Sequence, residues 1–172
     1  MKKNYYIFIL VFLYSLCNYG QCSPDITLPS ITPGIDQSST TDFGACLAIV
    51  NVTDAVFSDN CSGGISIAFT LSGATTSTSI LGQVGTYSFN KGVTTINYTV
   101  TDASSNSITG SKTITVTDNE NPTISTVPVV ATTNTGCTAT GVVLTVPTTA
   151  DNCSVASITN NHPSTTYSLG NT

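Results

Sequence analysis

The chain has 172 residues, of which only 8% are charged, and its formal net charge is -5. Globular domains usually carry about 25% charged residues, and here 32 Thr and 21 Ser take their place. The scarcity of Ala, Leu, Glu, Lys and Arg disfavours a helix-rich fold, and the acidic balance excludes a basic nucleic-acid surface. The residues show no catalytic constellation, so we expect a protein that is not an enzyme.

The first 20 residues have the pattern of a secretory signal peptide. Lys2 and Lys3 precede an apolar run, Tyr5–Leu16, and a short polar exit ends at Gly20. About 20 apolar residues are needed to cross a bilayer, so this run is too short for an anchor and no membrane span is expected. We therefore expect residues 1–20 to be removed, residues 21–25 to form a short linker, and the product to be secreted, as an extracellular or cell-surface protein.

Sequence motifs recur in the same order at one period, which indicates tandem repeats. We expect one full repeat over residues 26–118 and a partial repeat over 119–172. The two Asp-Asn-Cys triplets lie 92 residues apart. The matched segments are Pro29–Ile31 with Pro122–Ile124, Thr41–Cys46 with Thr133–Cys137, and Ser58–Ser62 with Ala150–Ser154.

Four cysteines of the repeats form two pairs with spacings of 15 and 16 residues. In an exported chain this favours the disulfides Cys46–Cys61 and Cys137–Cys153. Zinc sites prefer cysteines two to four residues apart, and that spacing does not occur. Cys22 is left over, either removed with the leader, free, or bonded to another molecule.

Strands are predicted along the first repeat from apolar residues that alternate with polar ones. The clearest case is Val93–Thr101, in which Ile96, Tyr98 and Val100 point to one face. Lys112–Thr117 alternates too, and the polar turn between these runs predicts a hairpin. Earlier in the chain we expect a proline-broken edge strand and three shorter strands: Ile26–Ile35, Leu47–Val52, Ile65–Leu71 and Thr86–Phe89.

The second repeat begins like the first but reaches only the first strands, expected at Ile124–Val130, Cys137–Val146 and Val155–Ile158. No counterpart of the Gly92–Thr117 hairpin follows before Thr172. We expect a fragment of a longer array; a natural short product, or a strand supplied by a partner, are the alternatives. The fold class is therefore all-β, with immunoglobulin-like β-sandwich repeats in tandem and the second repeat truncated.

The end of the first repeat resembles the hyalin repeat (HYR) family, most clearly in Gly92–Asn106 and Thr113–Asp118. The resemblance implies an immunoglobulin-like sandwich with a role in adhesion and neighbouring repeats of the same chain as partners. Many members carry a further cysteine pair in the first and last strands. Here Leu28 and either Ser111 or Lys112 occupy those places, which implies lower stability but the same fold.

An acidic joint, Asp118-Asn119-Glu120, lies between the repeats. Calcium takes six to eight oxygen ligands, so these side chains, together with Asp102 from the preceding hairpin turn, are a candidate calcium site. The alternative is a solvated linker, with Asp102 capping its own turn through backbone N–H groups. No other cofactor is expected.

Three further candidates have ordinary structural explanations. The Asp-Asn pairs before Cys61 and Cys153 are expected to form turns. His162 has no cysteine or carboxylate at a useful spacing, so no catalytic or metal role is expected for it. Tyr87 and Phe89 could stack on a sugar, but alternating aromatic residues in strands usually belong to the core.

These patterns predict a non-enzymatic adhesion or spacer module with an extracellular protein or glycan as its ligand. The alternative from another class is an accessory or carbohydrate-binding module of a secreted hydrolase whose catalytic domain lies outside these residues.

Overall fold

The computed structural model describes residues 22, 24–61, 63–161, 163–168 and 170. The predicted signal peptide and His162 lie outside these residues. The described chain is all-β: it contains thirteen strands and no helix. Its several sheets are consistent with the β-sandwich that the number and spacing of the expected strands predict.

The chain divides into two compact units, and the second includes a short loop that interrupts the first along the sequence. Unit 1 consists of the residues up to Thr40 together with Leu47–Thr117. Unit 2 consists of Asp118–Thr172 and also takes in the loop Thr41–Cys46.

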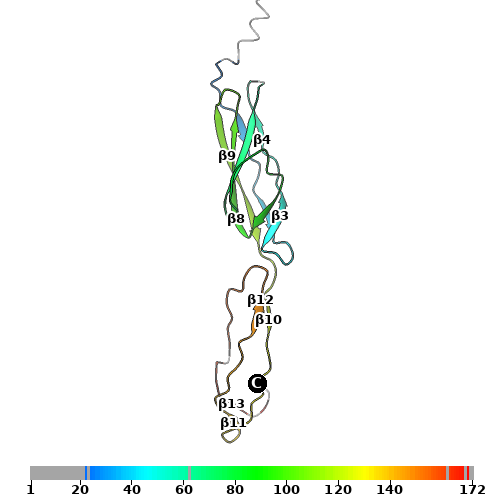
Figure 1. Ribbon diagram of the computed structural model, residues 1–172, viewed down its shortest axis with the longest axis vertical. Coiled ribbons are helices and arrows are strands. Elements are labelled where there is room, and N and C mark those ends of the chain that lie inside the picture. The colour runs from blue at the N-terminus through cyan, green and yellow to red at the C-terminus, as the bar shows by residue number, and fades with distance from the viewer. Residues whose placement is uncertain (1–21, 23, 62, 162, 169, 171–172) are drawn as a thin grey trace, which may run out of the picture. The chain divides into compact units, whose positions relative to one another are not determined.

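Unit 1 contains a five-stranded sheet and two smaller pairings (Figure 1). The five-stranded sheet has the order β2-β9-β8-β5-β6, and the pairs are β3-β7 and β1-β4. The strands are β1 (Ser30–Thr32), β2 (Gln37–Thr40), β3 (Leu47–Asn51), β4 (Val56–Ser58), β5 (Ser66–Gly73), β6 (Ser77–Leu81), β7 (Thr86–Asn90), β8 (Gly92–Thr101) and β9 (Ser107–Thr117).

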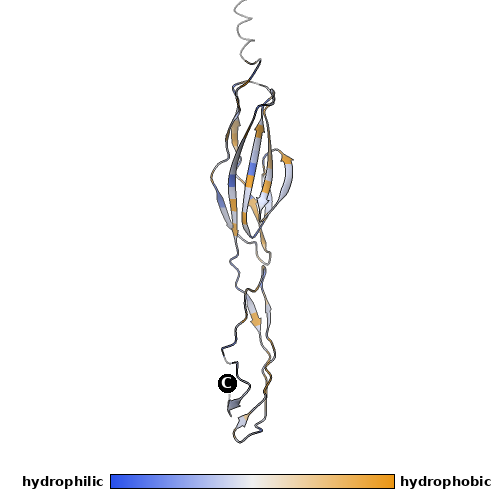
Figure 2. Ribbon diagram, turned by 90° about the vertical axis from the view of Figure 1, so that its left-hand side faces the viewer, coloured by the Kyte–Doolittle hydropathy of each residue, from blue (hydrophilic) through white to orange (hydrophobic). Residues whose placement is uncertain are grey.

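The predicted hairpin is the centre of unit 1. β8 and β9 pair antiparallel from Gly92 opposite Val116 to Thr101 opposite Ser107. Ile96, Tyr98 and Val100 are all completely buried, as their alternation predicts. The burial of successive residues alternates along β8, and Figure 2 shows hydrophobic and hydrophilic residues interspersed along the strands.

The core joins side chains from more than one sheet. Ala48 of β3 and Phe89 of β7 are fully buried in one cluster with Phe69 of β5 and Ile114 of β9. Each of the larger side chains, Phe69, Phe89 and Ile114, contributes about 1.5–3 kcal/mol when it is removed from water. The apolar alternation in the sequence therefore accounts for the layers of unit 1.

Three strands of unit 1 are not predicted from the sequence. β2 is wholly polar and pairs parallel with β9, from Gln37 opposite Ile114 to Thr40 opposite Thr117. β4 and β6 are short and largely exposed. The predicted edge strand over residues 26–35 is shorter than expected, since only β1 is hydrogen-bonded to a neighbour.

Unit 2 has short strands only. They are β10 (Thr123–Ser125), β11 (Thr138–Ala139), β12 (Thr148–Ala150) and β13 (Tyr167–Ser168), paired as β10-β12 and β11-β13. Residues 155–158 do not form the predicted strand: Ile158 is 49% exposed, and this segment has no ladder partner among the described residues. A short apolar alternation cannot specify a strand where no neighbouring strand accepts its hydrogen bonds.

Candidate functional site

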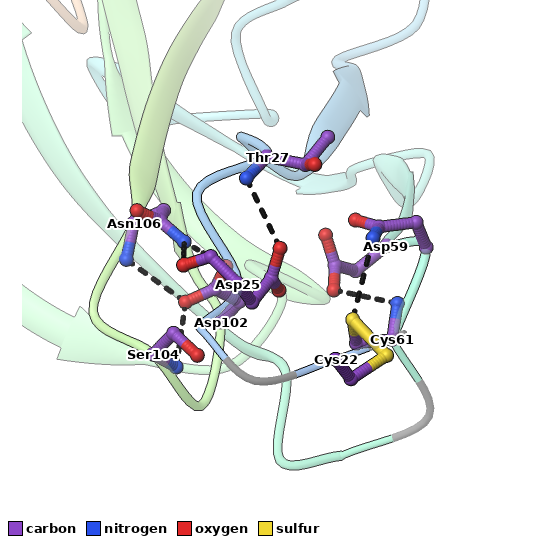
Figure 3. The surroundings of a disulfide bond; sticks show 9 residues. Cys22, Asp25, Thr27, Asp59, Cys61, Asp102, Ser104 and Asn106 are labelled. Atoms are coloured by element: carbon purple, nitrogen blue, oxygen red, sulfur yellow. Dashed lines mark hydrogen bonds between the residues drawn. A yellow bond between two sulfur atoms is a disulfide. The ribbon is translucent and has the colours of Figure 1, made fainter. Parts of the chain in front are cut away.

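The first Asp-Asn-Cys turn follows β4 directly. The Oδ2 atom of Asp59 accepts a hydrogen bond from the backbone N of Cys61 at 3.0 Å, which closes the turn. Cys61 is bonded to Cys22, with the two Cα atoms 5.7 Å apart (Figure 3). The turn is therefore closed twice, by a side-chain hydrogen bond and by a disulfide to a residue near the start of the described chain.

A small cavity of about 210 Å³ lies beside this disulfide. Carboxylate oxygens of Asp25 and Asp59 and the sulfur of Cys61 all lie within 4.8 Å of one another. The Oδ1 atom of Asp59 is buried and has no hydrogen-bond partner. The cavity is lined by Cys22, Asp25, Asp59, Cys61, Gly63, Ala103 and Ser104.

This cluster does not by itself make a complete metal site. The sulfur of Cys61 is part of a disulfide, so it is not the thiolate that zinc would take. Two carboxylates alone fall well short of the six to eight oxygens that calcium takes. In addition, the Oδ1 atom of Asp25 already accepts a hydrogen bond from the backbone N of Thr27 at 3.0 Å.

Asp102 caps the hairpin turn between β8 and β9. Its Oδ1 atom accepts bonds from the backbone N atoms of Ser104 and Asn106, both at 2.8 Å, and its Oδ2 atom accepts one from the Asn106 side chain at 2.8 Å. Burial raises the pKa of Asp102, but these hydrogen bonds outweigh it and the pKa lies below its ordinary value. The same Asn106 side chain donates to the backbone oxygen of Asp25 at 3.1 Å, which links the hairpin to the segment before β1.

The second Asp-Asn-Cys turn follows β12 and repeats the local geometry of the first. The Oδ1 atom of Asp151 accepts bonds from the backbone N atoms of Cys153 and Ser154, both at 2.8 Å. Cys153 is bonded to Cys46, and their Cα atoms are 4.7 Å apart. The amide of Asn152 donates to the backbone oxygen of Ala45 at 2.9 Å, so the residue beside the cysteine also holds the loop that contains Cys46.

The acidic joint is part of unit 2, and its two carboxylates already accept hydrogen bonds from backbone N–H groups. The Oδ1 atom of Asp118 accepts a bond from the backbone N of Glu120 at 3.1 Å. The Oε1 atom of Glu120 accepts one from the backbone N of Gly44 at 2.6 Å. The calcium site predicted at Asp118, Asn119, Glu120 and Asp102 stays a prediction, since Asp102 belongs to unit 1 and the other three to unit 2.

The predicted disulfides Cys46–Cys61 and Cys137–Cys153 are wrong. The structure pairs Cys22 with Cys61 and Cys46 with Cys153, and Cys137 is free and exposed. The prediction rested on spacing along the chain, whereas a disulfide requires two Cα atoms within about 4.4–6.8 Å in the fold. Cys46 belongs with the residues of unit 2, and Cys61 lies in unit 1.

Sequence equivalence alone does not predict the partner of Cys22. Asp25 and Asp118 lie 93 residues apart, and each accepts a hydrogen bond from the backbone N two residues later, that of Thr27 and that of Glu120. The position that matches Cys22 before Asp118 is Thr115 of β9. The second Asp-Asn-Cys turn bonds to Cys46 instead.

Lys112 is a buried cation, a role that its place at the start of an alternating strand does not by itself reveal. It is 3% exposed, and its Nζ donates to the backbone oxygen and Oγ1 of Thr53 at 2.6 and 2.8 Å and to Oε1 of Gln37 at 3.3 Å. Burial lowers the pKa of Lys112, and this effect exceeds the opposing charges of Asp54 and Asp36. Its position in phase with the inward-facing residues of β9 is the signal that could have marked it.

The aromatic pair considered for sugar stacking belongs to the core. Phe89 is completely buried, and Tyr87 packs between Phe69 and Phe89, with ring centroids 6.4 and 5.5 Å away. A stacked sugar would need an open ring face, which Phe89 does not offer.

Comparison with known proteins gives no relative: no family model, no curated protein sequence and no solved structure matches the chain. Within the described residues, no helix has the length and apolar character that crossing a membrane would require.

Proposed function

We propose that this protein is a non-enzymatic adhesion or spacer module of the extracellular space, built from tandem immunoglobulin-like repeats of the hyalin type. The observation that carries the proposal is a local unit that occurs twice: a short strand pair followed by an Asp-Asn-Cys turn that a disulfide closes. The second repeat in this proposal is partial and continues in a longer array.

The two strand pairs have the same register. Ser30 lies opposite Ser58 in the β1-β4 pair, and Thr123 lies opposite Ala150 in the β10-β12 pair. The hydroxyl of Ser30 donates to the backbone oxygen of Ser58 at 3.1 Å, and that of Thr123 donates to the oxygen of Ala150 at 3.1 Å. The 92–93-residue sequence period thus has a counterpart in hydrogen bonding, which supports tandem copies of one unit.

The two disulfides overlap along the chain, and this arrangement suits a protein that bears tension. Cys46 lies inside the loop that Cys22–Cys61 closes, and Cys61 lies inside the loop that Cys46–Cys153 closes. A force applied between Cys22 and Cys153 therefore meets a covalent path through both bridges and only about 15 residues of backbone. At about 3.5 Å per extended residue, that path allows about 60 Å of length, against about 460 Å for the unbridged chain.

The same bridges support the extracellular location, because disulfides form and persist in oxidising compartments. The signal-like leader points to the same location. With the leader removed, two lysines remain against nine carboxylates, a balance that disfavours binding to nucleic acid and to anionic membranes.

Single-molecule force spectroscopy on the exported chain, held at its two ends, tests the spacer role. We expect the oxidised protein to stop extending after the short bridged path and the tail beyond Cys153. Reduction should release about 400 Å more. An oxidised chain that extends as far as the reduced chain would overturn the proposal.

Two double variants calibrate the experiment. Without the first bridge, in Cys22→Ser/Cys61→Ser, the path between positions 22 and 153 should lengthen only to about 90 Å. Without the second, in Cys46→Ser/Cys153→Ser, it should reach about 330 Å. The order of these lengths follows from the overlap of the bridges, so equal lengths for both variants would contradict the covalent path.

A further inference from the structure

Cys137 is the one described cysteine that is not in a disulfide, and it is exposed. By itself a free cysteine indicates nothing about function. Its meaning comes from the equivalent cysteine of the first repeat, Cys46, which is bonded to an Asp-Asn-Cys turn in the same structure.

Cys46 and Cys137 both lie where a turn meets a strand, and the two turns differ in detail. Each cysteine comes directly before a strand, β3 for Cys46 and β11 for Cys137. A glycine in the left-handed region lies two residues before Cys46 (Gly44, φ 70°) and directly before Cys137 (Gly136, φ 62°). A backbone hydrogen bond from Ala45 N to Asp42 O at 3.0 Å closes the turn that ends just before Cys46, and one from Thr138 N to Thr135 O at 3.1 Å closes the turn that contains Cys137.

The contacts around Cys46 show how an Asp-Asn-Cys turn binds to the loop that contains this cysteine. Besides the disulfide, Asn152 of the incoming turn donates to the backbone oxygen of Ala45 at 2.9 Å and lies 3.4 Å from Oγ1 of Thr41. In the second repeat, Gly136 supplies the backbone oxygen just before Cys137. Thr133 is the matched residue of Thr41 in the aligned sequences.

We propose that Cys137 is a covalent docking site for the Asp-Asn-Cys turn of a further copy of this repeat. The inference rests on the proposed function, because it requires an array of repeats. In both observed bridges the Asp-Asn-Cys cysteine bonds to a cysteine that lies earlier in the chain, before its own repeat. Cys137 is the earlier cysteine of the next such bridge, and the incoming asparagine amide binds the Gly136 carbonyl.

The bond-forming step is thiol–disulfide exchange. The thiolate of Cys137 or of the incoming cysteine attacks a small disulfide such as oxidised glutathione, which forms a mixed disulfide and releases one glutathione thiolate. The second cysteine thiolate then attacks that mixed disulfide. The protein gains one S–S bond and loses two protons and two electrons, and the oxidant leaves as two thiols.

The chain itself supplies both partners for a test. In Cys22→Ser, Cys61 becomes a free thiol within an Asp-Asn-Cys turn, and Cys137 of another molecule is its proposed acceptor. We expect the exported variant, in a buffer of oxidised and reduced glutathione, to form covalent oligomers linked head to tail. Peptide mapping of the oligomer bands should find Cys61–Cys137 at least about fivefold above the two symmetric linkages together, whereas unselective pairing would give about equal amounts.

The matched control is Cys61→Ser, which removes the same bridge but leaves Cys22, a thiol outside any Asp-Asn-Cys turn. Because both variants lose the same disulfide, any loss of folding affects both alike. Cys61→Ser should show no preference among its linkages, and Cys22→Ser/Cys137→Ser should not form extended oligomers. A Cys22→Ser protein that stays monomeric, or that pairs without preference, would overturn the docking site.

Failure of this docking test can be distinguished from failure of the proposed spacer function. The force experiment depends only on the two bridges within the chain, so Cys137→Ser should leave the measured extension unchanged. If the docking test fails while the oxidised chain extends as expected, the docking site is refuted and the spacer function is not.

Discussion

The two units of this chain differ in what stabilises each of them. Unit 1 has a buried cluster that includes Tyr98, Phe89 and Ile96, all fully inaccessible. In unit 2, Ala139 is the one buried hydrophobic side chain among the described residues. Several larger apolar side chains there are exposed instead: Ile124, Val127, Val130, Val143 and Val146.

Unit 2 therefore depends on covalent and polar contacts. The Cys46–Cys153 bridge and the hydrogen bonds of Asn152 and Glu120 fix the loop Thr41–Cys46 to it. A disulfide closes the Asp-Asn-Cys turn in both units, and the difference between them is that unit 1 also has a buried apolar core.

The largest expected effect comes from removing the second bridge. Cys46→Ser/Cys153→Ser removes the bridge within unit 2, and the loss of a native disulfide typically costs a small secreted domain about 2–5 kcal/mol. Because unit 2 has little core, we expect hydrogen-exchange protection to fall in β10–β12 while β8 and β9 keep theirs. Equal loss in both units would contradict the division between covalent and hydrophobic stabilisation.

A matched pair of isoleucine substitutions sharpens the same comparison. Ile96 is completely buried in unit 1, and Ile124 is 64% exposed in unit 2. Ile96→Ala should lower the free energy of unfolding of unit 1 by about 2–5 kcal/mol through the cavity it leaves. Ile124→Ala should change stability by no more than about 0.5 kcal/mol, measured by urea denaturation. A large cost at Ile124 would show that unit 2 has an apolar core after all.

Acid titration tests the hairpin turn of unit 1. Asp102 has a lowered pKa in the folded state, so its contribution is present above about 3.8 and is lost as the pH falls through the folded value. Asp102→Asn should therefore be less stable than wild type at neutral pH, and the difference should shrink below pH 3.8. A difference that does not depend on pH would mean that the charge of Asp102 does not stabilise the turn.

The smallest expected effect concerns Lys112 at alkaline pH. Its folded pKa is lowered, so the unfolded chain binds more protons and wild-type stability gains from Lys112 as the pH rises toward 10.5. Lys112→Met should remove this gain, so the stability difference between the two proteins should change as the pH rises toward 10.5. The raised pKa of Tyr98 acts in the opposite direction in both proteins and cancels in their difference. Parallel stability curves for the two proteins would contradict the shift at Lys112.

The amino-acid sequence alone determined the all-β class, the β8–β9 hairpin and the inward face of Ile96, Tyr98 and Val100. It could do so because period-two alternation reports directly which side of a strand leaves water. It also determined that Asp59 and Asp151 form turns, since an Asp side chain bonds the backbone two residues later.

The tertiary structure alone decided the cysteine pairing, the parallel strand β2 and the burial of Lys112. Each of these depends on residues far apart in the chain: Cys46 meets Cys153, and Gln37 lies opposite Ile114. Spacing along the chain does not give distance across the fold. For that reason two cysteines 15 residues apart each found a more distant partner.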